Sequence, residues 1–119
     1  MNENEKAQEL ASAIRALGDV FVSRIPATME EMEGELALIK QHYLDLTPWQ
    51  NLHRHLHSMA GSAGTFGYAE LGDRARELEL RANEILKSAI MTTDQNRAHF
   101  ILDLHHYMTW VDDSFVKNR

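Results

Sequence analysis

Hydrophobic residues recur along nearly the whole chain with the period of an α-helix. They stand three and four residues apart, the spacing that places apolar side chains on one face of a helix. Five stretches carry such an apolar stripe, at residues 10–21, 25–43, 49–66, 71–85 and 101–115. No stretch alternates polar and apolar residues in the way a strand does. The pattern therefore predicts an all-α protein.

Proline and capping residues indicate where two of the helices begin. Pro26 follows Ile25. Because proline cannot continue a helix without losing a hydrogen bond but starts one well, we expect a bend or a break there. Thr47 precedes Pro48, and Gln50 stands three residues after the threonine. This combination of an N-cap, a proline at the first helical position and a capping-box partner predicts a helix start at Pro48.

Glycine and a second threonine indicate the remaining boundaries. Gly67 suits the left-handed conformation that ends many helices, so the third helix should run from about residue 48 to residue 66. Thr92 with Gln95 offers a capping box for the last helix, and residues 87–91 are expected to connect it to the preceding one. The four helices that carry the last four stripes are expected to be about 17 to 23 residues long, roughly 25 to 35 Å, and their short connections require antiparallel neighbours.

These boundaries predict an antiparallel up-and-down four-helix bundle with an additional N-terminal helix. The first stripe, at residues 10–21, is shorter and partly polar. We expect it to cap one end of the bundle or to lie across the next helix. With 119 residues, 44% of them hydrophobic, the chain is long enough for one domain with a core, so residues 1–119 are assigned to a single domain.

Composition excludes several functional classes. The chain has no cysteine, which removes disulfides, thiolate metal sites and cysteine nucleophiles and fits a reducing compartment. Its first residues are polar and do not resemble an export signal, and no apolar run approaches the roughly 20 residues of a membrane span. A cytoplasmic protein is therefore expected. The formal charge of −6 argues against a nucleic-acid ligand and favours a protein partner.

The third stripe contains a histidine next to two glycines. Each glycine inside a helix costs about 1 kcal/mol relative to alanine, so Gly61 and Gly64 need a compensating reason. On a helical wheel His53, His57, Gly61 and Gly64 fall within about 60° of one another, away from the apolar stripe. We therefore expect the imidazole of His57 to stand on an open surface that another macromolecule can approach closely.

These residues resemble the signature of the histidine phosphotransfer (HPt) domain. The resemblance covers roughly residues 18–115 and is carried by Leu52, Leu56, His57, Met59, residues 61–67, Leu71, Leu78 and Glu79. It implies that His57 is the phosphoacceptor and that the chain relays a phosphoryl group between aspartates of receiver domains, in response regulators or hybrid histidine kinases. It also implies a monomeric carrier without a cofactor, because the Mg²⁺ of the reaction would belong to the receiver.

The residues agree with such chemistry. Phosphoryl transfer passes through an in-line, largely dissociative transition state, so it needs a nucleophile with clear space along the line of attack. An ordinary imidazole, with a pKa near about 6.5, is mostly neutral at pH 7 and can attack through a ring nitrogen. The sequence has no glycine-rich nucleotide loop and no room for an ATP-binding domain. A kinase is therefore excluded.

One position departs from the family pattern. The family often has a lysine three residues after the phosphoacceptor, whereas this chain has Ala60. Arg54 or His53 could supply the missing positive charge. The predicted docking surface thus consists of Gly61, Gly64, His53, Arg54 and Ala60. Glu79 is either a hydrogen-bond partner that orients His57 or a solvated carboxylate on the surface of the next helix.

Two other functional classes remain open at this point. A helical adaptor would keep the bundle and its docking surface without needing His57. A metal-binding bundle would use His53 and His57, whose i, i+4 spacing can ligate Zn²⁺ from one helix face. Two ligands do not close a tetrahedral site, and His57 lies away from the apolar stripe, so we expect no metal site.

Overall fold

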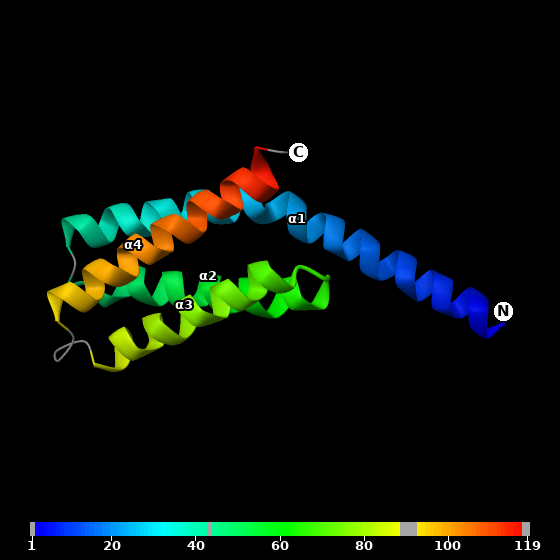
Figure 1. The fold of residues 1–119 in the computed structure, drawn as a ribbon, viewed down its shortest axis with the longest axis horizontal. Coiled ribbons are helices and arrows are strands. Elements are labelled where there is room, and N and C mark those ends of the chain that lie inside the picture. The colour runs from blue at the N-terminus through cyan, green and yellow to red at the C-terminus, as the bar shows by residue number, and fades with distance from the viewer. Residues whose placement is uncertain (1, 43, 89–92, 118–119) are drawn as a thin grey trace.

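The computed structural model describes residues 2–42, 44–88 and 93–117, and its regular elements there are all helical. Helix α1 spans Glu3–Gln41, α2 Leu46–Thr65, α3 Ala69–Lys87 and α4 Asp94–Val111, and a π-helical turn, η1, follows at Asp112–Val116. Figure 1 shows the second half of α1 beside α2, α3 and α4 in one bundle. The all-α prediction is confirmed for the described residues.

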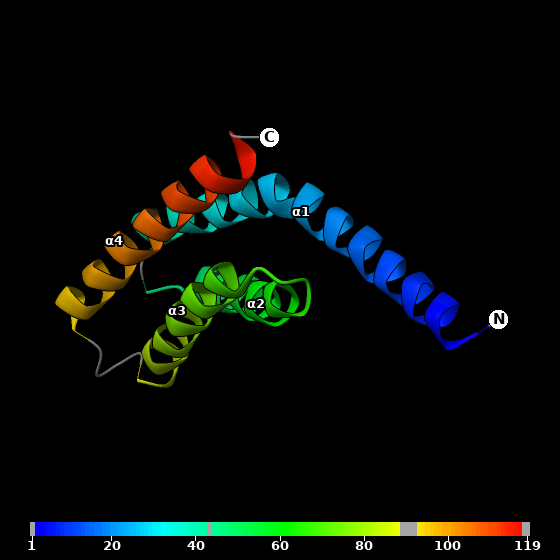
Figure 2. The ribbon, with the colours of Figure 1, turned by 45° about the vertical axis from the view of Figure 1, so that its right-hand side comes forward.

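Of the bend or break expected at Pro26, the structure shows a bend, and the helix does not break. Helix α1 is a single helix of 39 residues with Pro26 inside it. Ile25 and Met29 are buried on either side of the proline, and Phe21 packs on Phe66 with ring centroids 5.8 Å apart. This packing on both sides offsets the hydrogen bond that proline removes. Figures 1 and 2 show α1 changing direction as it leaves the bundle, as a proline kink would cause.

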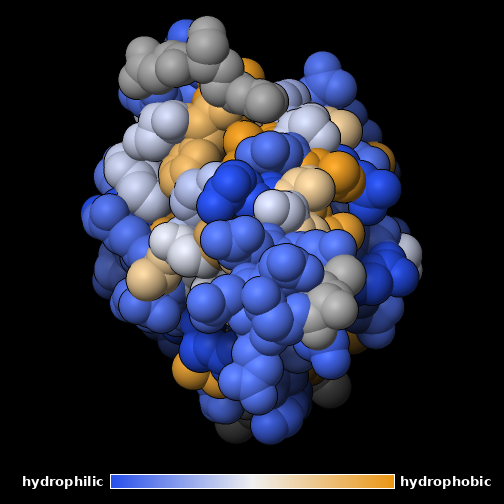
Figure 3. Space-filling view, turned by 90° about the vertical axis from the view of Figure 1, so that its right-hand side faces the viewer, coloured by the Kyte–Doolittle hydropathy of each residue, from blue (hydrophilic) through white to orange (hydrophobic). Residues whose placement is uncertain are grey.

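The additional N-terminal helix is replaced by an extension of α1. Gly18 is buried against Phe66, and before it the chain projects beyond the bundle instead of capping it or crossing it. Leu10, Ile14 and Leu17 are exposed there. Figure 3 looks at this end of the molecule and shows a mostly hydrophilic face with separate hydrophobic patches. The first apolar stripe is helical as predicted, and Phe21 at its end packs against the core, but its earlier apolar residues remain exposed.

The other stripes form the core. Trp49 on α2 packs against Phe100 on α4, with ring centroids 5.5 Å apart. The Tyr107 hydroxyl donates a hydrogen bond to the Leu71 carbonyl at 3.0 Å, joining α4 to α3. The largest fully buried side chains come from all four helices: Ile25, Met32, Ile39, Trp49, Leu52, Leu56, Leu71, Phe100, Leu104 and Val111.

Two helix starts differ from the sequence prediction. Asp45, not Thr47, is the N-cap of α2, and its carboxylate accepts a hydrogen bond from the Thr47 backbone N–H at 3.0 Å. Pro48 fits the first turn, where backbone N–H groups have no intrahelical partner. Thr93 caps α4 by accepting from the Asn96 N–H at 3.1 Å. The predicted cap at Thr92 and most of the predicted 87–91 connection lie outside the described residues.

The connection between α2 and α3 is short and positions the two helices closely. Helix α2 ends at Thr65, and Gly67 has a φ of +88°, which confirms the predicted left-handed stop. On α3, a β-carbon built at Gly72 would stand 3.2 Å from the Ala60 carbonyl oxygen and 3.3 Å from the Gly64 nitrogen. The absence of a side chain at Gly72 therefore lets the backbones of α2 and α3 approach each other.

Candidate functional site

His57 projects from the middle of α2 beside α3. Its Nδ1 atom lies 2.6 Å from Oε1 of Glu79 on α3, and its side chain is 69% exposed. The helix places His57 next to the apolar positions Leu56 and Met59 but outside the core that they enter. The ring is thus held at one edge by α3, while most of its surface faces solvent.

The partner of Nδ1 determines which nitrogen can react. A carboxylate only accepts hydrogen bonds, so Nδ1 of His57 carries the proton that it donates to Glu79. In the neutral ring the lone pair then resides on Nε2. No described residue forms a hydrogen bond to Nε2. The arrangement presents a histidine of fixed tautomer with its basic nitrogen available.

Glu79 is a buried residue rather than a solvated carboxylate. Only 8% of it is exposed, and Oε2 is buried without a hydrogen-bond partner among the described residues. Burial of a charged group is unfavourable unless hydrogen bonds compensate for lost hydration. Of the two alternatives left open by the sequence, the geometry matches a hydrogen-bond partner that orients His57.

His53 lies one helical turn before His57 and shares the same carboxylate. The two imidazole rings are stacked, with centroids 6.3 Å apart and an interplanar angle of 16°. Nε2 of His53 stands 3.9 Å from Glu79 Oε1, and its side chain is 30% exposed. Two histidines of α2 and one glutamate of α3 therefore form one compact group.

The remaining polar residues of this histidine-rich segment face α1. His55 Nε2 lies 3.4 Å from Glu31 Oε2, and the Asn51 side-chain amide donates to Glu35 Oε1 at 3.1 Å. The Arg54 guanidinium donates to the Asn51 side chain. Arg54, which the sequence placed in the docking surface, is thus bound on the flank of α2 that faces α1, whereas His53 is on the flank that faces α3.

The glycines and the alanine of the predicted docking surface have different surroundings. A β-carbon built at Gly61 or at Gly64 would meet nothing within 4 Å, so both positions border open space. Ala60, in contrast, is only 7% exposed and belongs to the core. Its assignment to the docking surface is wrong, because its side chain is buried, and its carbonyl oxygen lies against Gly72 of α3. The sequence also did not single out Gly72, although a glycine inside a helical stripe is a signal of close approach.

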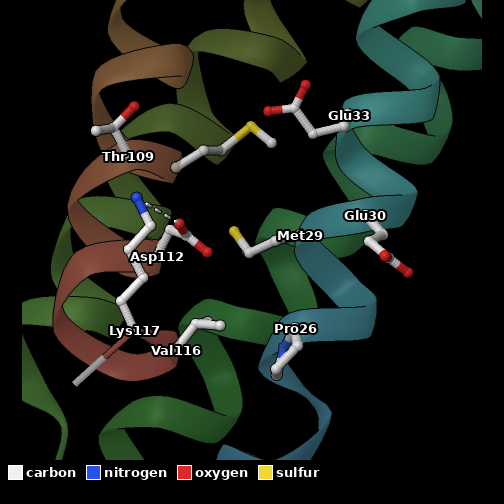
Figure 4. A pocket seen from close by; sticks show the side chains of 9 residues that line it. Pro26, Met29, Glu30, Glu33, Thr109, Asp112, Val116 and Lys117 are labelled. Atoms are coloured by element: carbon white, nitrogen blue, oxygen red, sulfur yellow. Dashed lines mark ion pairs between the residues drawn. The ribbon is translucent and has the colours of Figure 1, made fainter. Parts of the chain in front are cut away.

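Several cavities lined by described residues lie away from this histidine group. One, of about 450 Å³, lies between α1 and the C-terminal segment and is lined by Pro26, Met29, Met108, Val116 and an ion pair of Lys117 with Asp112 at 3.4 Å (Figure 4). In the part of the chain that the structure describes, no group of three or more histidine, cysteine, aspartate or glutamate side chains is placed to hold a metal ion.

The fold and the site define a class of protein: a helical bundle that presents one oriented histidine to solvent beside a surface formed by glycines. The Hpt domain family model matches residues 16–105, and the chain belongs to that family. Hpt domains carry phosphoryl groups in phosphorelays and are not themselves kinases. Comparisons with curated proteins and with solved structures return no match. Among the described residues, no helix has the length and hydrophobicity that a membrane crossing requires.

Proposed function

We propose that this chain accepts a phosphoryl group on Nε2 of His57 from an aspartyl phosphate of one receiver domain and passes it to the aspartate of another. The observation that carries the proposal is the 2.6 Å hydrogen bond from His57 Nδ1 to the buried Glu79. It sets the tautomer in which Nε2 is the nucleophile, on a ring that is otherwise open to a partner.

The step balances without a further catalytic group on this chain. The Nε2 lone pair forms the N–P bond, the P–O bond to the receiver aspartate breaks, and its electron pair stays on that carboxylate. The ring then carries both the phosphoryl group and the Nδ1 proton, and the positive charge that develops on it lies beside the Glu79 carboxylate. Mg²⁺ would be held by the receiver.

The open space around Gly61 and Gly64 supports the same proposal. A receiver must bring its aspartate in line with Nε2, so side chains beside the ring would obstruct it. Both glycines border unoccupied space on the chain's surface. A helical adaptor that is never phosphorylated would need neither this space nor a buried carboxylate at Nδ1, and the geometry therefore favours the carrier.

The test is transfer from receiver domains charged with a small-molecule phosphodonor. We expect an acid-labile, alkali-stable label on this chain and its loss in His57→Gln. His55→Gln is the matched control, because His55 lies on the same helix but pairs with Glu31 on α1. A label that survives His57→Gln would overturn the assignment of the acceptor. Absence of a label with every receiver tried would favour the adaptor.

A further inference from the structure

This chain has Ala60 where the Hpt motif often has a lysine, and two other residues near His57 can carry a positive charge. The sequence offers Arg54 and His53, and the structure separates them. Arg54 donates to Asn51, which is itself bound to Glu35 on α1. His53 instead stacks on His57 at 6.3 Å between ring centroids.

We propose that His53 takes up a proton from solvent when His57 is phosphorylated and that its imidazolium is the positioning charge for the phosphoryl group. The inference rests on the proposed function of His57. Three side chains carry the inference: the stacked rings of His53 and His57, and Glu79. Oε1 of Glu79 lies 3.9 Å from His53 Nε2 and 2.6 Å from His57 Nδ1.

The hydrogen bonds of Glu79 support this role. Oε1 is engaged by His57, while Oε2 is buried without a partner among the described residues. A protonated imidazole donates from both nitrogens, so a charged His53 can direct Nε2–H at the Glu79 carboxylate. This bond compensates for the burial of Glu79 and holds the positive charge of His53 against the ring that bears the phosphoryl group.

The charged groups near His53 come from α3 and α1. On α3 the charged group in contact with His53 is Glu79, 3.9 Å from its Nε2. Arg76 precedes Glu79 by three residues and is exposed, and because arginine stays charged at every accessible pH it adds no pH dependence. The acidic residues of α1, Glu31 and Glu35, are engaged by His55 and Asn51. A change in protonation near neutral pH therefore belongs to the histidines.

The direct test follows the titration of each histidine by NMR before and after chemical phosphorylation of His57 with phosphoramidate. A phosphoryl group next to a partly exposed imidazolium is worth about a two- to five-fold change in proton affinity. We therefore expect the titration midpoint of His53 to rise by about 0.3 to 0.7 pH units on phosphorylation. The midpoint of His55 should stay in place. No variant is needed, so misfolding cannot confuse the result.

Two variants give a readout that a purely structural role would not move. The measurement uses a receiver that exchanges phosphoryl groups with this chain. From pH 8 to pH 6, the share of phosphoryl groups held by His57 should increase in the wild type by about two- to five-fold more than it does in His53→Gln. His53→Lys carries a charge throughout this range, so it should hold the larger share at both pH values. His55→Gln should follow the wild type.

The outcomes separate this inference from the proposed function. If phosphoramidate and receivers leave His57 unmodified, the phosphoacceptor assignment fails and the role of His53 fails with it. If His57 is phosphorylated but the midpoint of His53 does not move, or if His53→Gln keeps the pH dependence of the wild type, only the role of His53 is overturned. A phosphorylated share that falls equally at pH 6 and pH 8 in Arg54→Ala, with no effect of His53→Gln, would assign the charge to Arg54 instead.

Discussion

Gly61 and Gly72 have opposite surroundings, so the same substitution at the two positions tests the close contact between α2 and α3. In a helix, Gly→Ala is favourable by up to about 1 kcal/mol if the new methyl group is accommodated. At Gly61 the methyl group would meet nothing within 4 Å, so Gly61→Ala should realise most of that gain. At Gly72 it would stand 3.2 Å from the Ala60 carbonyl oxygen and 3.3 Å from both Ala63 Cβ and the Gly64 nitrogen.

The contacts at Gly72 are with a helix backbone and a short side chain, which cannot rotate away. Overpacking of this kind usually costs about 1 to 3 kcal/mol, which offsets or exceeds the propensity gain. We therefore expect Gly72→Ala to be less stable than Gly61→Ala by about 1 to 3 kcal/mol, with a melting temperature several degrees lower. Urea and thermal unfolding followed by circular dichroism measure both. Equal stabilisation of the two variants would refute the inference that Gly72 sets the approach of the two helices.

Three further predictions concern single side chains. Gly61→Leu should slow transfer from a receiver without loss of melting temperature, and an unchanged rate would remove Gly61 from the docking surface. Tyr107→Phe should cost about 0.5 to 1.5 kcal/mol at pH 7 by removing the hydrogen bond to Leu71. Burial raises the pKa of Tyr107 above its ordinary value near 10, so the stability of the wild type should fall as pH rises above about 10. Urea titrations at pH 7 and above pH 10 should show this loss in the wild type and not in Tyr107→Phe. Ala60 is buried in the core, so Ala60→Lys should lower stability by about 1 to 3 kcal/mol in urea unfolding, and unchanged stability would show that this position is open to solvent.

The helices were predictable because a buried helix face requires apolar residues three and four positions apart, and this spacing is visible in a short stretch of sequence. The positions of α2, α3 and α4 follow from it, as does the stop at Gly67. Local signals alone do not distinguish a bend from a break at Pro26. The packing of Phe21 on Phe66 and the burial of Ile25, which keep α1 continuous, depend on residues distant in the sequence.

The candidate site was predictable to the same extent. His57 and the two glycines follow from the motif and from the helical wheel, which fixes directions on one helix. The wheel does not say which neighbouring helix occupies each direction. For this reason Ala60 was placed on the surface, although α3 covers it, and Glu79 remained ambiguous until its burial and its distance to His57 were known.

The polar contacts on the two flanks of α2 explain why His57 has one orientation. An apolar stripe tolerates some rotation of a helix about its axis, because aliphatic contacts are not directional. Hydrogen bonds depend on direction, so they restrict this rotation more than apolar contacts do. Asn51 donates to Glu35 of α1 on one flank, and His57 meets Glu79 of α3 on the other, so rotation of α2 in either direction distorts these hydrogen bonds. The direction of His57 Nε2 is therefore determined by α1 as well as by the motif on α2 and α3.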